Sequence, residues 1–318
     1  MMFNLIRQLR SVFKPILAAG VMAFAVGGAQ ANLVAPVPSG PFNALVFGDF
    51  RSTNADMWGG LIAGGRVELS TYEVNARRAS SFGVWTAGGG LMSNGRVNGD
   101  ITSNMNFASN AGHYEGKRVG TADLASLTPL RQFYSGMSAQ LATEAGARTA
   151  YRDPWTGLVF EGVASATRHV FNVNAADLPN VRWLDIRNVD ADEELIINIL
   201  GTSATFTNLD LSNSLGRYRT LLNYVDATLV HFSATAPWAD VLAPLATIVG
   251  GNGHIQGSVV AAAFDSQIEL HMGRAHFLSD PALVPLPGSL PLTGLALFAA
   301  FWIRRRPEGE GFKRPSAA

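Results

Sequence analysis

The chain of 318 residues contains no cysteine. That absence excludes disulfide bonds, thiolate metal sites and a cysteine nucleophile. Charged residues are also scarce, at 15% of the chain against roughly 25% in an average soluble domain. The 24 basic and 24 acidic residues cancel, so the chain is not a generally basic protein that coats nucleic acid, and no nucleic-acid partner is expected.

Glycine, by contrast, is abundant, with 33 residues, and it separates many short apolar segments. This composition favours a turn-rich, strand-rich structure. The length fits one large domain or two ordinary ones and is ample for a buried core.

The first 31 residues have the organisation of a secretory signal peptide. A short basic region is followed by an apolar, Gly/Ala-rich segment over 15–29 that is too short for a membrane anchor. The basic residues are Arg7, Arg10 and Lys14, and the cleavage site is formed by Ala29, Ala31 and Asn32. We therefore expect signal peptidase to release a mature chain that starts at Asn32, with a linker over 32–41.

The C-terminal segment has three parts. A proline-rich stretch over 280–289 is followed by an apolar run over 290–303 and a basic tail over 304–318. As a helix, the apolar run rises about 21 Å, short of the roughly 30 Å hydrocarbon core. Trp302 and snorkelling arginines would cover part of this mismatch. The run predicts a transmembrane helix, and the stop-transfer cations that keep the tail cytoplasmic are Arg304, Arg305 and Arg306.

This tail resembles the PEP-CTERM sorting signals in its three-part order. Its motif is similar to the variant that begins Val-Pro-Leu-Pro-Ala, and consists of Val284, Pro285, Leu286, Pro287 and Gly288. The resemblance implies recognition by an exosortase, a membrane protease that cleaves near the motif. The protein would then be anchored transiently in the membrane before it reaches the cell surface or the extracellular matrix.

The zero net charge of the chain is the sum of basic terminal segments and an acidic middle segment. The signal segment holds three basic residues, and the tail holds five basic and two acidic residues. Residues 32–303 keep 16 basic and 22 acidic residues, a net charge of −6. The exported body is therefore acidic, and Lys117 is its single lysine.

The body over 42–279 reads as a series of short strands separated by Gly and Asn corners, both of which tolerate positive φ. Such spacing suggests a solenoid of stacked coils or a β-sandwich. The run over 195–200 is nearly all apolar, which predicts a strand buried on both faces.

One amphipathic helix is predicted over about 129–146. Thr128 is placed to cap it, and Pro129 occupies a first-turn position. Gly146 is a suitable end. Its apolar stripe must pack against a sheet face and consists of Leu130, Phe133, Tyr134, Met137 and Leu141.

The body resembles the choice-of-anchor A domains from about residue 42 to 277. The similar segments are 42–50, 59–67, 171–178, 223–228, 242–244 and 253–261. The resemblance implies an adhesin-type module with a mainly β fold, a right-handed β-solenoid with one flanking α-helix. Members of that family are not known as enzymes, so we expect no catalytic residues and no cofactor.

Polar residues near the end of the body have a spacing that a metal site could use. Glu269 and His271 share one face of an expected strand, and His276 follows five residues later, which is a conceivable zinc set. A polar solenoid face explains these residues more simply, because a zinc site needs a defined third ligand and second shell. No metal site is therefore predicted.

Other carboxylates form two further groups. Asp49 and Asp56 flank a Gly/Asn-rich segment, where aspartates usually bond their own backbone. The acidic run over 190–194 reads as a solvated turn, although clustered carboxylates also suit Ca²⁺. Converging carboxylates would be expected of the alternative function, a polysaccharide-active β-helix enzyme.

Aromatic side chains beside arginines could bind carbohydrate or protein, or could simply belong to the core. They are Trp58, Trp85, Trp155, Trp183 and Trp238, with Tyr72, Tyr114 and Tyr151. The sequence as a whole predicts an exported, surface-anchored, non-enzymatic adhesive or structural module of the bacterial envelope or biofilm matrix. Its expected ligand is a matrix polysaccharide or a surface protein. An ice-binding solenoid is a weaker alternative, because the threonines are scattered.

Overall fold

The computed structural model describes residues 34–35, 37–103, 106–107, 112–155, 157–179, 181–209, 211–274 and 277–278. Strands dominate this part of the chain, and 17 of them join in one large sheet. The prediction of a mainly β fold is confirmed.

The elements follow one another in short alternating segments. In chain order they are β1 (Val34–Ala35), β2 (Phe42–Val46), β3 (Phe50–Asp56), β4 (Gly60–Ala63), β5 (Val67–Val74), β6 (Phe82–Thr86), β7 (Gly90–Asn98), β8 (Asp100–Ser103), β9 (Asn106–Phe107), β10 (Gly112–Glu115), β11 (Thr121–Ala122), η1 (Leu124–Leu127), α2 (Thr128–Ala142), β12 (Arg148–Thr149), β13 (Tyr151–Arg152), β14 (Gly157–Glu161), β15 (Arg168–Asn174), η2 (Ala175–Asp177), β16 (Trp183–Arg187), β17 (Glu194–Leu200), β18 (Ser203–Thr207), α3 (Ser212–Leu215), β19 (Arg219–Tyr224), β20 (Leu229–Ser233), β21 (Asp240–Gly251), β22 (His254–Gln256), β23 (Val259–Ser266) and β24 (Glu269–His271).

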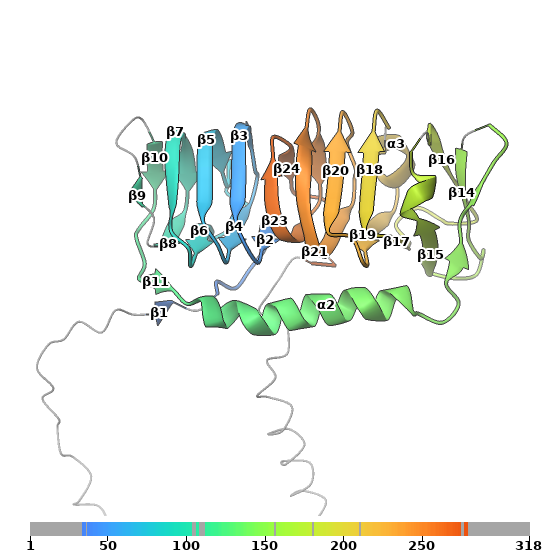
Figure 1. Cartoon of the computed structure of the whole chain (residues 1–318), viewed down its shortest axis with the longest axis horizontal. Coiled ribbons are helices and arrows are strands. Elements are labelled where there is room, and N and C mark those ends of the chain that lie inside the picture. The colour runs from blue at the N-terminus through green and yellow to red at the C-terminus, as the bar shows by residue number, and fades with distance from the viewer. Residues whose placement is uncertain are drawn as a thin grey trace, which may run out of the picture. The chain divides into compact units, whose positions relative to one another are not determined.

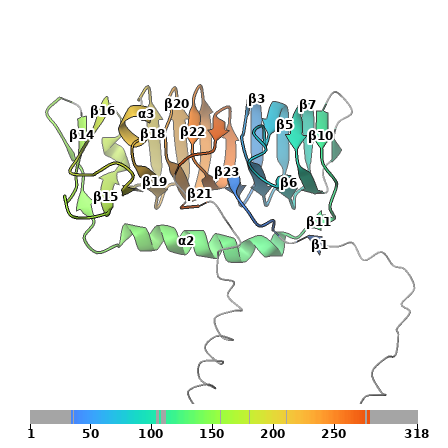
Figure 2. The same cartoon turned by 180° about the vertical axis from the view of Figure 1, so that it is seen from behind.

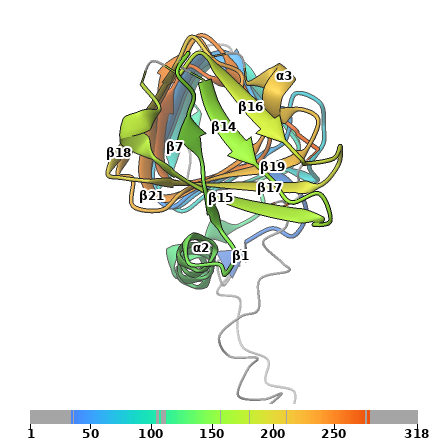
Figure 3. The same cartoon turned by 90° about the vertical axis from the view of Figure 1, so that its right-hand side faces the viewer.

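The strands stack as coils of a β-solenoid. Equivalent strands of neighbouring coils pair in parallel, as β3 does with β5 and β5 with β7. Seen along the stack in Figure 3, the strands form three sides, and α2 lies outside one of them. We call the side under α2 the helix face. It is formed by β2, β4, β6, β15, β17, β19 and the starts of β21 and β23.

Residues with positive φ line up at one corner of the coils. Asn54, Thr71 and Asn94 occupy equivalent places after paired residues of β3, β5 and β7, with φ between 51° and 53°. Asn208, Ala234 and Asn252 do the same after β18, β20 and β21. Asparagine suits this left-handed conformation, as the sequence predicts, whereas Thr71 and Ala234 adopt it at a steric cost.

The coils do not stack in sequence order. β2 lies in the middle, between β4 and β23. The chain builds outward through β6 and β8, and α2 then runs back along the stack (Figure 1 and Figure 2). Later coils return from the other end through β15, β17, β19 and β21 to β23. The first and last coils are therefore neighbours.

Two apolar cores hold this arrangement. The inner core fills the solenoid and includes Phe50, Tyr72, Ile197 and Phe264. The outer core lies between the helix face and α2 and includes Leu45 and Ile196. Since Ile196 and Ile197 of β17 point to different cores, this strand is buried on both faces, which confirms the prediction made for 195–200.

Helix α2 has the predicted apolar stripe but different ends. Leu130, Tyr134 and Leu141 are buried, while Phe133 is 37% exposed. Thr128 makes no side-chain cap, because the preceding turn, η1, continues directly into the helix and is capped by Asp123. The helix ends at Ala142, four residues before the predicted end, and Gly146 lies in the turn that follows with φ +86°.

The terminal segments fall outside the described residues. These include the predicted signal peptide, the proline-rich motif, the apolar run over 290–303 and the arginines after it. Within the part of the chain that the structure describes, none of the helices has the length and hydropathy needed to span a membrane.

Candidate functional site

The helix face is closed by α2. One row of outward side chains crosses eight neighbouring strands of this face: Asn172, Asn198, Asn223, Leu242, Val260, Leu45, Ile62 and Trp85. The apolar half of the row packs in the outer core with Leu127, Leu130 and Tyr134. The helix therefore covers most of this row, and both Asn198 and Asn223 are buried.

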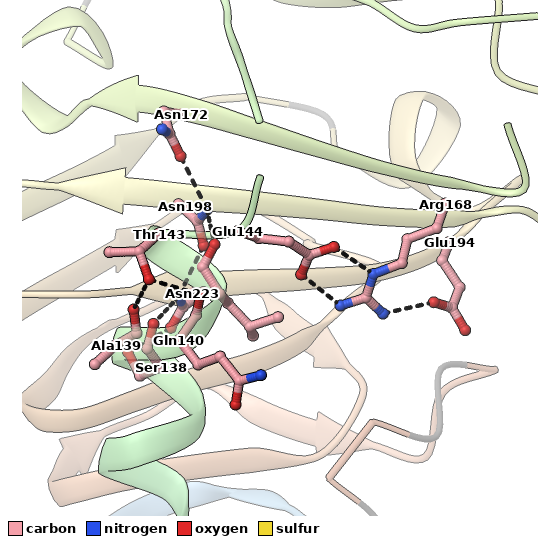
Figure 4. Close-up of polar contacts among 11 residues, drawn as sticks. Ser138, Ala139, Gln140, Thr143, Glu144, Arg168, Asn172, Glu194, Asn198 and Asn223 are labelled. Carbon is pink, nitrogen blue, oxygen red and sulfur yellow. Dashed lines mark hydrogen bonds and ion pairs between the residues drawn. The ribbon is translucent and has the colours of Figure 1, made fainter. Parts of the chain in front are cut away.

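The polar half of the row is a ladder of three asparagines that binds the C-terminal half of α2 (Figure 4). Asn198 Nδ2 donates to Asn172 Oδ1 at 2.9 Å and to the Leu141 carbonyl at 2.8 Å. Asn223 Nδ2 donates to Asn198 Oδ1 at 2.8 Å and to the Ser138 carbonyl at 3.0 Å. The Ser138 hydroxyl donates back to Asn223 Oδ1 at 2.6 Å. These buried amides thus satisfy one another and the helix backbone.

An ion-pair cluster fastens the turn after α2 to the same end of the solenoid (Figure 4). The Arg168 guanidinium contacts Glu144 at 2.9 Å and Glu194 at 2.8 Å. Its hydrogen bonds with Glu144 raise the pKa of Arg168. Because these groups are partly exposed, the cluster orients the turn more than it stabilises the fold.

The role of these asparagines was not predicted from the sequence. A signal was present, because each amide stands inside an apolar strand and the three recur at intervals of 26 and 25 residues. An amide side chain in a strand that is buried on both faces needs a hydrogen-bond partner. The backbone carbonyls of the amphipathic helix supply that partner. The ladder is structural, which leaves the two uncovered sides as candidate binding surfaces.

The first uncovered side is the hydroxyl face, formed by β18, β20, the starts of β3, β5 and β7, and the ends of β21 and β23. Two rows of outward side chains run along it. The first row consists of Thr207, Ser233, Gly251, Gln267, Thr53, Ser70 and Ser93. The second consists of Thr205, His231, Val249, Asp265, Arg51, Glu68 and Leu91.

A groove of about 490 Å³ lies on the hydroxyl face where β23, β3, β5 and β7 run side by side. It is lined by hydroxyl and amide groups of the first row and by Arg51, Glu68 and Asp265 of the second. Glu68 forms ion pairs with Arg51 at 3.1 Å and with Arg66 at 2.9 Å. The groove therefore presents alternating donors and acceptors at the spacing of parallel strands, about 4.8 Å.

The second uncovered side is the histidine face, formed by β22, β24 and the ends of β3, β5 and β7. A bridge between Met57 and Leu270 joins the end of β3 to β24. Asp56, Glu269 and His271 meet there, with one potential ligand atom from each lying within 4.8 Å of the others. Asp56 and Glu269 also line a hollow of about 780 Å³, together with Glu73 and Arg96.

Burial shifts the pKa values of several groups on the histidine face. It raises the pKa of Asp56, and the charge of Glu269 raises it further. Burial also raises the pKa of Tyr72, and the charge of Asp56 adds to that effect. In the opposite direction, burial and the neighbouring His271 lower the pKa of His254. Desolvated groups of this kind are common at functional sites.

Residues 37–272 match a family described as "Putative Ice-binding-like adhesive domain". The match covers well over half of the chain. The chain belongs to this family of ice-binding-like adhesive domains. No curated protein and no solved structure matches the chain. The expectation of an adhesin-type module is supported, and membership in an adhesive-domain family suggests an extracellular or surface location.

Two other groups of residues were singled out from the sequence: the processing residues of the terminal segments and the acidic run over 190–194. The residues named for signal cleavage, sorting and stop-transfer lie outside the described residues. The acidic run before β17 makes contacts with neighbouring side chains: Glu193 contacts His169 at 2.9 Å, and Glu194 forms an ion pair with Arg219 at 3.2 Å. Its carboxylates are not among those that converge within the described residues.

The expectation for Asp49 and Asp56 needs correction. Asp49 accepts a hydrogen bond from the Arg66 amide of the next coil at 2.8 Å, not from its own turn. Asp56 belongs to β3 and meets Glu269 and His271. His276, the third residue of the zinc set considered from the sequence, lies outside the described residues. Asp56 is a third potential ligand beside Glu269 and His271, because the solenoid brings an early and a late segment of the described domain into contact.

The aromatic residues divide between core and surface. Trp85 and Tyr72 are buried, whereas Trp155 is 77% exposed and Trp183 and Trp238 are also exposed. Arg77 lies 5.0 Å from the ring of Trp58, and Arg118 lies 5.9 Å from the ring of Tyr114. None of these aromatic residues lines the groove of the hydroxyl face.

Proposed function

We propose that this chain is an exported, surface-anchored, non-enzymatic adhesive module that binds matrix polysaccharide through the groove of the hydroxyl face. The observation that carries the proposal is this groove, lined by hydroxyl, amide and charged groups on an uncovered side of an adhesive domain. Such groups hydrogen-bond sugar hydroxyls, and an open groove admits a polymer that continues past it.

Export and anchoring rest on the terminal segments. The N-terminal segment supports release by signal peptidase. The Val-Pro-Leu-Pro-Gly motif, the apolar run and the three arginines support membrane insertion followed by processing by an exosortase-type protease. Resemblance to choice-of-anchor A domains supports the same reading, in which one adhesive module is joined to different anchors. The destination would be the outer envelope or the biofilm matrix.

The groove assignment is tested by steric blocking. Ser70 and Ser233 both belong to the first row of the hydroxyl face, but only Ser70 lines the groove. Ser70→Trp should reduce binding on an array of matrix polysaccharides by about tenfold or more, whereas Ser233→Trp should leave it unchanged. Equal binding by both variants would remove the groove from the proposal. Binding to surface proteins but to no glycan would mean that the ligand is a surface protein and not a polysaccharide.

A polysaccharide-active enzyme is the second candidate, favoured by the convergence of Asp56 and Glu269 beside a hollow. Paired carboxylates of this kind can serve as general acid and base. That candidate predicts that purified chain shortens an acidic polysaccharide and that Asp56→Asn abolishes the shortening. The adhesive proposal predicts binding with unchanged polymer length.

An ice-binding role is favoured by the row of hydroxyls on the hydroxyl face, where strand stacking aligns residues that are scattered in the sequence. The adjacent row carries Arg51, Glu68 and Asp265, and charged groups hold their own hydration shells. We therefore expect no thermal hysteresis from the purified chain, and a measurable freezing-point gap would reinstate this role.

A further inference from the structure

The histidine face contains a cluster of three potential metal ligands. Asp56 ends β3, and Glu269 and His271 lie two residues apart on β24. The Met57–Leu270 bridge fixes the two strands against each other, so the meeting of these side chains is a consequence of backbone pairing. All three ligand atoms lie within 4.8 Å of one another.

The imidazole nitrogen of His271 faces both carboxylates. Its Nε2 lies 3.2 Å from Glu269 Oε2 and 3.8 Å from Asp56 Oδ1. The longer separation is not a hydrogen bond. The three potential ligand atoms thus surround one small space, and this arrangement suits coordination of a shared cation.

Two buried oxygen atoms at this place have no hydrogen-bond partner. One is Oδ1 of Asp56, which belongs to the cluster, and the other is the hydroxyl of the neighbouring Tyr72, which is 1% exposed. Both residues line the hollow with Glu269. The Ser52 hydroxyl, near Tyr72, donates instead to the Ser266 carbonyl at 2.7 Å. Leaving a buried carboxylate oxygen unpaired beside a second carboxylate is costly, and a cation would remove that cost.

Neighbouring rings hold His271 in place. The ring of Trp58 stacks on it at 4.0 Å, and the ring of His254, from the adjacent strand β22, stacks on it at 4.7 Å. Arg77 in turn lies 5.0 Å from the ring of Trp58. A ligand held by packing loses little freedom when it binds a metal, which is what an organised site requires.

We propose that Asp56, Glu269 and His271 form a binding site for a divalent transition-metal ion of the Zn²⁺ type. One imidazole nitrogen and two carboxylate oxygens suit Zn²⁺ and its first-row neighbours, whereas Ca²⁺ and Mg²⁺ prefer oxygen-only sets. Three protein ligands leave coordination positions for water or for an oxygen of a bound molecule. Glu269 and Asp56 retain side-chain exposures of 48% and 36%, so the ion would be reachable from solvent.

The test is calorimetric titration of untagged, chelator-treated full chain with Zn²⁺, in a mild detergent. We expect one saturable site. Asp56→Asn and Glu269→Gln remove a charge with little change of shape, and each should weaken binding by about tenfold or more. The matched control is Glu73→Gln, which removes the same charge one strand away and should change affinity much less.

A second measurement does not depend on the folding of a ligand variant. Because Trp58 stacks on His271, Ni²⁺ at the site should quench part of the tryptophan fluorescence, and excess Zn²⁺ should restore it. Trp58→Phe should bind Ni²⁺ but lose the quenching. The proposal is overturned if wild-type chain shows no saturable binding, if Glu73→Gln weakens binding as much as the ligand variants, or if Ca²⁺ binds in place of Zn²⁺.

Discussion

At the residue scale, the buried carboxyl group of Asp240 links the last described residues to the solenoid. Asp240 is 0% exposed, and its oxygens accept hydrogen bonds from Ser258 N at 2.7 Å and Phe277 N at 2.9 Å. Burial raises the pKa of Asp240 to about 7, even though these backbone donors act in the opposite direction. Desolvation therefore outweighs hydrogen bonding at this group.

This pKa predicts an unusual dependence of stability on pH. Since the folded pKa lies above the unfolded value near 3.9, the protonated group favours the folded state. Its contribution is complete below about pH 4 and is lost as the pH rises to about 7, with a total on the order of 4 kcal/mol. Denaturant unfolding of wild type and Asp240→Asn across this range measures the difference. A difference that is constant with pH would show that Asp240 is ionised throughout.

At the element scale, α2 is stabilised by tertiary contacts. It has no side-chain cap at its N-terminus, and its first turn contains no acidic residue. Its contacts with the solenoid are apolar at Leu130 and Tyr134, and polar at the asparagine ladder. An isolated helix of 15 residues is marginal in water, so α2 should form only together with the coils that it covers.

Leu130→Ala tests the apolar half of this contact. Leu130 is 4% exposed, and Leu124, in the turn before the helix, is 56% exposed. Leu130→Ala should lower the free energy of unfolding by about 2–4 kcal/mol, and Leu124→Ala by less than about 1 kcal/mol. Equal losses in urea unfolding would mean that the outer core contributes little.

At the scale of the whole molecule, stability depends on one junction between early and late coils. β2 pairs with both β4 and β23, so the two series of coils share one strand ladder. Asn43, which is 0% exposed, reinforces the junction. Its Nδ2 donates to the Gly257 and His271 carbonyls at 3.0 and 3.2 Å, and its Oδ1 accepts from Gly59 N at 2.9 Å.

Asn43→Ala should weaken this junction, because it leaves buried backbone groups of both series unpaired at about 1–3 kcal/mol for each group. We expect faster hydrogen exchange in β2, β23 and β24 while β7 and β17 keep their protection. Asn174→Ala is the control, since Asn174 is exposed and accepts a local hydrogen bond from Ala176 N. A uniform increase in exchange along the solenoid would contradict the prediction.

Much of the local structure was predictable from the sequence. Apolar runs bounded by Gly and Asn indicated the strands, and the 3.6-residue spacing of Leu130, Tyr134 and Leu141 indicated the helix and its buried face. The ends of the helix were less predictable, since Thr128 looks like a cap but continues a preceding turn. The positive φ of Thr71 and Ala234 was not predictable, because stacking with neighbouring corners imposes it.

The sequence alone determined the composition of each piece: acidic body, short strands, one amphipathic helix and distinctive terminal segments. These properties follow from residue types and spacings over a few turns of chain. Only the tertiary structure decided which coils are neighbours, because parallel pairing of β2 with β23 and of Met57 with Leu270 brings distant segments together. The asparagine ladder, the groove and the cluster of Asp56, Glu269 and His271 all depend on such pairing, in which no local signal specifies the partner.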